Sequence, residues 1–98
     1  MLTSKERSNL KAIASNIEPI TQIGKNGITE NLVKSLSDAL DKREIIKVSV
    51  LQNSDEIPKN YGDELAKILK AEHVATIGRR IILYRFSQKE GVKHVEFR

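Results

Sequence analysis

Residues 24–27 form a short G-x-x-G segment, Gly24-Lys25-Asn26-Gly27, whose composition suits contact with an anion. Two glycines three positions apart permit positive φ angles and let another molecule's backbone approach without a Cβ atom in the way. Thr29 is placed to cap the next helix with its side chain. The free N–H groups and the positive dipole end of that helix would then face the same bound molecule. The segment therefore predicts an anion-binding loop.

Basic residues are concentrated toward the C-terminus. The chain has 98 residues and a formal net charge of +4. Its first 78 residues hold 11 Lys/Arg and 11 Asp/Glu, whereas the last 20 hold six and two, so the whole excess lies in the last fifth. The six are Arg79, Arg80, Arg85, Lys89, Lys93 and Arg98. This asymmetry favours a polyanionic partner such as nucleic acid, and the alternative is a solvated basic tail.

Three groups of cations could converge on phosphate: Lys25 with Asn26, Arg79 with Arg80, and Arg85 with the basic tail. The planar fork of donors in arginine matches phosphate oxygens. Aromatic residues are scarce, at 4% of the chain, which argues against a base-stacking platform of the RRM type. The chemistry favours recognition of phosphate and shape over sequence reading.

Catalysis and metal binding find little support. No serine lies in a G-x-S-x-G setting, and no G-x-x-x-x-G-K-[ST] motif is present. The absence of cysteine excludes disulfides and thiolate zinc sites, and two isolated histidines, His73 and His94, are too few for a metal cluster. We expect His73 to be structural. We expect no cofactor, no metal and no enzymatic activity, with a nuclease or RNA-modifying enzyme as the weakest alternative.

The composition is that of one soluble globular domain. Hydrophobic residues make up 39% and charged residues 31%, and the length leaves too little material for a second core. No run of 18 apolar residues occurs and the N-terminus is polar, so neither a membrane span nor a secretory signal is expected. We expect a cytoplasmic monomer.

Hydrophobic periodicity and end signals predict seven elements. A capping box from Thr3 to Glu6 opens a helix over about residues 3–16, and Pro19 leads into a short strand that ends at Ile23. The next two elements are a helix at 29–42 and a strand at 44–51. A third helix begins at Ser54 or Asp55 and runs to about residue 72. Strands at 74–77 and 80–86 form a hairpin that turns at residues 78 and 79.

The order α-β-α-β-α-β-β predicts a single compact α/β domain. Strands separated by a helix should run parallel through right-handed crossovers, and the closing hairpin makes the four-stranded sheet mixed. Three helices cannot cover both faces equally, so part of the sheet should stay open. The strand order is left undetermined. Residues 87–98 are expected to form a basic tail that contributes more to binding than to stability.

The chain resembles the CRM domain family, in its stand-alone bacterial YhbY type. The resemblance spans nearly the whole chain and rests on residues 10–12, 23–29, 44–48 and 77–85. It implies a fold similar to the C-terminal domain of bacterial translation initiation factor three, and binding to ribosomal RNA in precursors of the large subunit. The closing block of the plant-type members has glycines where Arg79 and Phe86 stand here.

Together these observations predict an RNA-binding protein that assists assembly of the large ribosomal subunit. The alternative is a protein-protein adaptor or translation-associated factor that uses an open sheet edge. The predicted RNA-binding residues are Gly24, Lys25, Asn26, Gly27, Thr29, Arg79, Arg80 and Arg85.

Overall fold

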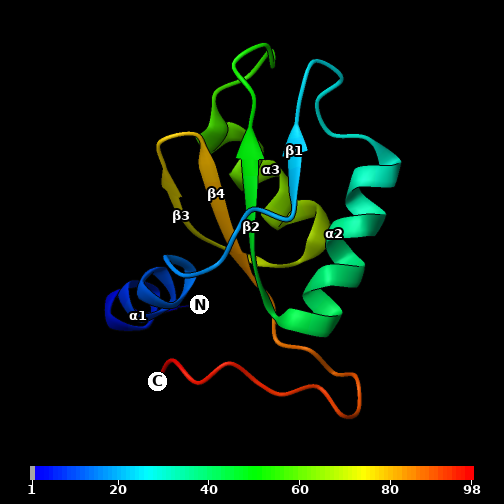
Figure 1. The fold of residues 1–98 in the computed structure, drawn as a ribbon. Helices are drawn as coiled ribbons and strands as arrows, with labels where there is room; N and C mark the ends of the chain where they lie inside the picture. The colour runs from blue at the N-terminus through cyan, green and yellow to red at the C-terminus, as the bar shows by residue number, and fades with distance from the viewer. Residues whose placement is uncertain (1) are drawn as a thin grey trace.

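The structure is a computed structural model and describes residues 2–98. Its elements, in chain order, are α1 (Ser4–Ala14), β1 (Thr21–Ile23), α2 (Glu30–Arg43), β2 (Ile45–Val50), α3 (Pro58–Leu69), β3 (Glu72–Ile77) and β4 (Arg80–Tyr84). Figure 1 shows one mixed sheet with helices on both faces. The predicted order and the four-stranded mixed sheet with three helices are confirmed.

The strands lie in the order β1-β2-β4-β3. β1 and β2 are parallel, as the intervening α2 requires, and β4 is antiparallel to both β2 and β3. The hairpin therefore folds back so that β4 fills the space between β2 and β3. We call the end where β1 and β2 finish the loop end, and the opposite end, where β4 finishes, the tail end (Figure 1).

The side chains of β2 alternate between two cores. Ile46, Val48 and Val50 face α2 and α3 and are almost completely buried. Ile45 faces α1 and belongs to a second core that includes Leu10 and Phe97. Because α1 covers only the part of this second face near the tail end, the part near the loop end carries no helix (Figure 1).

Local hydrogen bonds explain where the helices begin. The capping box of α1 is present, with the Glu6 N–H donating to Thr3 Oγ1 and the Thr3 N–H donating to the Glu6 carboxylate. The predicted start of α3 at Ser54 or Asp55 was wrong, because α3 begins at Pro58. Ser54 Oγ instead donates to Leu51 O at 2.8 Å, which shapes the loop after β2.

Packing explains why position 62, inside α3, is a glycine. The ring of His73 lies so close that a Cβ atom on Gly62 would be 2.5 Å from two of its atoms. Asp63 binds His73 Nδ1 and Thr76 binds His73 Nε2, both at 2.7 Å, so the ring is held in place. His73 is therefore structural, as the sequence predicted.

The C-terminal segment, residues 87–98, packs on the domain. Phe97 is only 6% exposed and makes an edge-on contact with Tyr84, with ring centroids 4.9 Å apart. The backbone oxygen of Phe97 accepts a hydrogen bond from Asn9 in α1. These contacts show that the segment is docked on the domain, and the expectation that it contributes more to binding than to stability stays a prediction.

Glu44 holds this segment in place from the end of α2. Its carboxylate is fully buried and accepts hydrogen bonds from Ser87 N–H, Val95 N–H and His94 Nδ1, each at 2.7 Å. Burial raises the pKa of this carboxyl, but the hydrogen bonds outweigh burial, so the pKa lies below its ordinary value of 4.5. The Glu44 backbone has a φ of 66°, a left-handed conformation unfavourable for a residue other than glycine.

We predict that Phe97→Ala lowers the free energy of unfolding by about 3 kcal/mol, because it removes a buried aromatic ring. The neighbouring Arg98→Ala should lower it by less than about 1 kcal/mol, since the Arg98 side chain is 75% exposed and contributes an ion pair with Glu6 and a contact with the Phe97 ring. Urea denaturation of both variants measures the difference. Small, equal losses would contradict the packing of the C-terminal segment.

A second prediction concerns Glu44→Gln. A lowered pKa in the folded state means that the ionised carboxylate stabilises the fold above its unfolded pKa, and that this stability is lost as pH falls through the folded pKa. The glutamine has one acceptor oxygen for three donors, so the variant should be less stable than the parent at pH 7. The difference in free energy of unfolding between parent and variant should shrink toward pH 3, which urea denaturation at a series of pH values measures. A difference that stays constant with pH would contradict an ionised Glu44.

Candidate nucleic-acid interface

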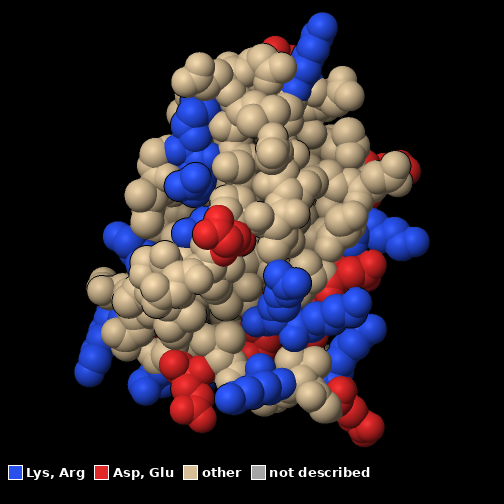
Figure 2. Space-filling model, viewed as in Figure 1, with Lys and Arg blue, Asp and Glu red and all other residues tan. Residues whose placement is uncertain are grey.

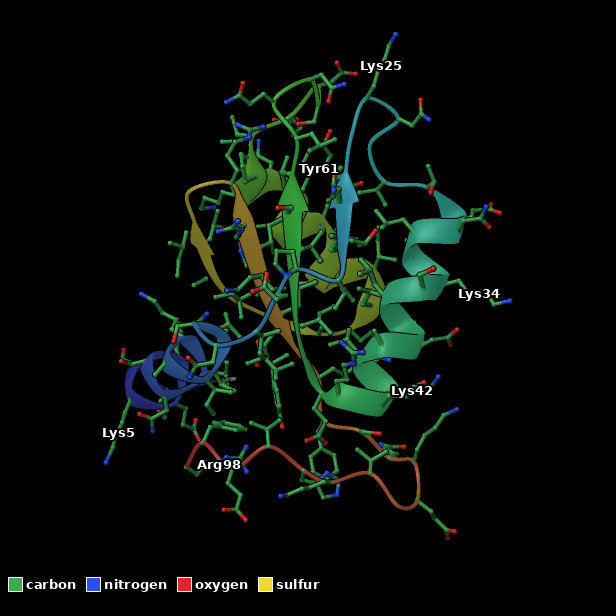
Figure 3. The ribbon with its side chains drawn as sticks, viewed as in Figure 1. Lys5, Lys25, Lys34, Lys42, Tyr61 and Arg98 are labelled. Atoms are coloured by element: carbon green, nitrogen blue, oxygen red, sulfur yellow. The ribbon has the colours of Figure 1, made fainter. Side chains whose placement is uncertain are left out.

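The G-x-x-G segment forms a tight turn at the loop end. The Gly27 N–H donates to Gly24 O at 3.0 Å, which places Lys25 and Asn26 at the exposed corners. Gly27 has a φ of +64°, so it needs the freedom of glycine, whereas Gly24 has no positive φ. Lys25 points away from the body of the protein into solvent (Figure 3).

Helix α2 begins beside this turn. Thr29 Oγ1 accepts a hydrogen bond from the Leu32 N–H at 3.1 Å, which confirms Thr29 as the N-cap. The N–H groups of Glu30 and Asn31 have no acceptor within residues 2–98. A hollow of about 370 Å³ lies here, lined by Thr21, Gln22, Gly24, Lys25, Asn26, Gly27, Thr29, Asn31, Leu32 and Ser35. The turn and the helix N-terminus thus offer backbone donors and one lysine to the same hollow.

The β3–β4 hairpin places its two arginines differently. The guanidinium of Arg79 donates from Nε to Val50 O at 2.8 Å and from one terminal nitrogen to Leu51 O at 2.6 Å. Arg79 therefore fastens the hairpin to the end of β2. Arg80 is exposed, and its side chain makes no hydrogen bond or ion pair within residues 2–98.

Arg85 lies at the tail end, away from the turn. Its guanidinium donates to Leu69 O and Ser37 O, both at 2.9 Å, and to the Asp41 carboxylate at 3.0 Å. It therefore joins β4 to α2 and α3. Of the three cationic groups singled out in the sequence, the structure brings two to the loop end and places the third at the opposite end.

The uncovered part of the sheet carries a row of polar residues, of which the sequence reasoning had singled out only Arg80. Ser49 pairs with Gln22 on one side and with Arg80 on the other, and Lys47 lies two residues along the same face. We call these four residues the open sheet face. Figure 2 shows Lys and Arg side chains gathered over the β4 side of this face. In the sequence, Lys47 and Ser49 alternate with apolar residues, which indicates that they share one face of the strand. This alternation does not reveal which face of the sheet lacks a helix.

The CRS1/YhbY (CRM) domain family matches residues 2–85 of the chain. The chain belongs to this family. The resemblance inferred from the sequence is thus confirmed, and the matched residues include all seven described elements. No helix within residues 2–98 of this CRM domain is long and apolar enough to cross a membrane.

Several proteins resemble this CRM domain along almost their full length. The Bacillus subtilis protein named "Probable RNA-binding protein YqeI" is 42% identical over 91% of the chain and 93% of its own length. A Haemophilus influenzae protein named "RNA-binding protein" is 32% identical over 94% of the chain and 93% of its own length. These names and the family agree with the prediction of a non-enzymatic protein.

A solved structure supports the fold. The solution structure of a hypothetical protein from Staphylococcus aureus, described as a candidate RNA-binding protein, superposes with a TM-score of 0.82. The two chains are 43% identical and cover each other completely. The described architecture therefore extends across relatives of this CRM domain.

We predict that the two glycines of the turn respond differently to alanine. Gly27→Ala forces an alanine into positive φ and should cost about 1–2 kcal/mol of stability. Gly24→Ala should be nearly neutral, because its Cβ atom would lie 3.5 Å from Leu51 Cδ1, an ordinary contact. Thermal denaturation measures both. Equal losses of stability in the two variants would contradict the positive φ of Gly27.

Proposed function

We propose that this CRM domain binds the sugar-phosphate backbone of structured ribosomal RNA in precursors of the large subunit and so assists assembly. The observation that carries the proposal is the meeting of the G-x-x-G turn, the N-terminus of α2 and Arg80 at the loop end. RNA as the partner is supported by the names of the relatives. The ribosomal target comes from the family resemblance, and a cytoplasmic location fits that role.

In this proposal the turn clamps one stretch of RNA backbone. Gly24 and Gly27 let the phosphates approach closely, while Lys25, Asn26 and the free N–H groups at the start of α2 supply donors. Thr29 holds that helix start in place through its cap. Contact through backbone donors and a flexible lysine recognises phosphate without reading bases.

The open sheet face extends the contact. Gln22 and Arg80 lie on either side of Ser49, so their Cα atoms are separated by two strand spacings, about 10 Å. Polar side chains at this spacing can bind further phosphates or 2′-hydroxyls, which distinguish RNA from DNA. In this proposal Arg79 does not contact RNA, because its guanidinium is hydrogen-bonded to the end of β2, and it serves to position the hairpin. Arg85 has the same kind of internal role at the tail end.

A protein partner is the second candidate. Three large apolar residues near the loop end are each at least 40% exposed: Leu51 directly follows β2, Ile57 is the N-cap of α3, and Ile77 is the last residue of β3. They could dock a partner protein beside the basic residues. The two functions differ in salt dependence, because phosphate contacts release counterions and apolar contacts do not.

The central experiment uses Lys25→Asp combined with Asn26→Asp. Aspartate is well tolerated in a turn and is favoured near a helix N-terminus, so the fold should be retained. The variant places two negative charges where the RNA backbone is proposed to lie, so affinity for ribosomal RNA should fall severely even at low salt. Filter binding and thermal denaturation measure the two effects.

The matched control is Lys5→Asp, which changes an exposed lysine in the first turn of α1, far from the loop end (Figure 3). It should leave RNA affinity nearly unchanged. If the double variant melts like the parent and binds ribosomal RNA as tightly, the turn is not the site.

A salt series tests Arg80. Loss of one phosphate contact in Arg80→Ala should flatten the slope of log K against log[salt] by about 0.7–0.9. Arg79→Ala should mainly lower stability, since it leaves two backbone oxygens of the β2 end without their donor. An unchanged slope in Arg80→Ala would remove Arg80 from the interface.

A further inference from the structure

Three of the chain's four aromatic residues gather at the tail end, opposite the G-x-x-G turn. They are Tyr84, Phe86 and Phe97, and His94 joins them. The rings of Phe86 and His94 are stacked, with centroids 4.4 Å apart and planes 13° from parallel. Phe86 is 56% exposed. Although the chain has few aromatic residues, most of them therefore lie together in one region of the fold.

The stacked pair is held rigidly by Glu44. The two residues that flank Phe86 donate their N–H groups to Glu44: Arg85 to its backbone oxygen at 2.8 Å and Ser87 to its carboxylate at 2.7 Å. His94 Nδ1 donates to the same buried carboxylate. One residue thus fixes the backbone on both sides of one ring and the orientation of the other. Such restraint lowers the entropy lost when a ligand binds.

The surroundings of Phe86 indicate the chemistry of a ligand. Phe86 lines two hollows. The polar residues of the first are Asp41, Lys70, Glu72, Arg85 and Gln88, and those of the second include His94, Glu96 and Arg98. Both hollows contain donors and acceptors, which suits the polar edges of a nucleobase more than a bare phosphate. Lys70 is exposed and makes no hydrogen bond or ion pair within residues 2–98, so it is available to a phosphate.

Packing accounts for only part of the Phe86 ring. The ring stacks on His94, yet it is 56% exposed and so leaves apolar surface in water. The tail end also carries the C-terminal segment, which belongs to the part of the chain that holds the entire excess of positive charge. An aromatic face beside cations is the usual arrangement for binding single-stranded nucleic acid.

We propose that the Phe86–His94 stack binds an unpaired nucleobase of RNA, with Lys70 contacting an adjacent phosphate. The proposal rests on the proposed function, because it adds a second contact on the same RNA. The turn and the stack lie at opposite ends of a molecule that measures 36 × 27 × 23 Å. The domain would then hold a structured region at the loop end and an adjoining single strand at the tail end.

The first test uses fluorescence. The chain contains no tryptophan, so Phe86→Trp introduces a single tryptophan and keeps an aromatic face. Octauridylate and octaadenylate should quench its emission on stacking, whereas a blunt RNA duplex of equal length should quench it far less. Ile68→Trp, at a 46% exposed position on α3, is the control and should show no such quenching. Equal quenching of the two variants would contradict the proposal that the stack binds a nucleobase.

The second test measures affinity for the same octanucleotides. Phe86→Ala should weaken binding by about 5- to 100-fold, the usual effect of losing one stacked base, without changing the salt slope. Lys70→Ala should instead flatten that slope by about 0.7. Phe86→Tyr keeps the ring and should bind like the parent. Melting curves confirm that each variant is folded.

The outcomes separate this proposal from the proposed function. If Phe86→Ala binds octanucleotides as tightly as the parent, while the parent still binds structured ribosomal RNA through the turn, the stack is not a base site and the function stands. If the parent binds neither kind of RNA, both proposals are wrong.

Discussion

The buried carboxylate of Glu44 is the constraint on which the tail end depends. It lies where α2 ends and β2 begins, and it binds three donors from the C-terminal segment. Without these bonds the charge would be buried alone, which is strongly unfavourable. The left-handed backbone at this position is therefore retained because the contacts around it compensate for the strain. One acidic residue thereby connects a helix, the sheet and the last residues of the chain.

Sheet topology separates the two proposed contacts. Parallel pairing of β1 with β2 sends both following loops to the loop end, and the antiparallel β4 starts there with Arg80 and finishes at the tail end before Phe86. The same strand thus links the proposed phosphate-binding region to the aromatic stack. Because α1 and the C-terminal segment cover only one half of the second sheet face, the polar row beside Arg80 stays accessible.

The basic residues show why charge in a sequence is an incomplete guide to a binding surface. Arg79 and Arg80 are adjacent, yet one guanidinium binds backbone oxygens of β2 and the other is exposed. Arg85 likewise joins helices from within. Long arginine side chains satisfy buried carbonyl groups as readily as phosphates, and sequence alone does not distinguish the two uses. Lys25 lies at the corner of a glycine turn, where local geometry leaves its side chain exposed.

The sequence by itself determined the elements, their order, the G-x-x-G turn and the Thr29 cap, because helical and strand periodicity, capping and turn chemistry act over a few residues. The family was recognisable from the resemblance of whole sequence blocks. Only the tertiary structure decided the strand order, the internal roles of Arg79 and Arg85, the docking of residues 87–98 and the stacking of Phe86 on His94. Each of these depends on contacts between residues far apart in the chain. Glu44 and His94, for example, are 50 positions apart, and no local pattern marks either as the other's partner.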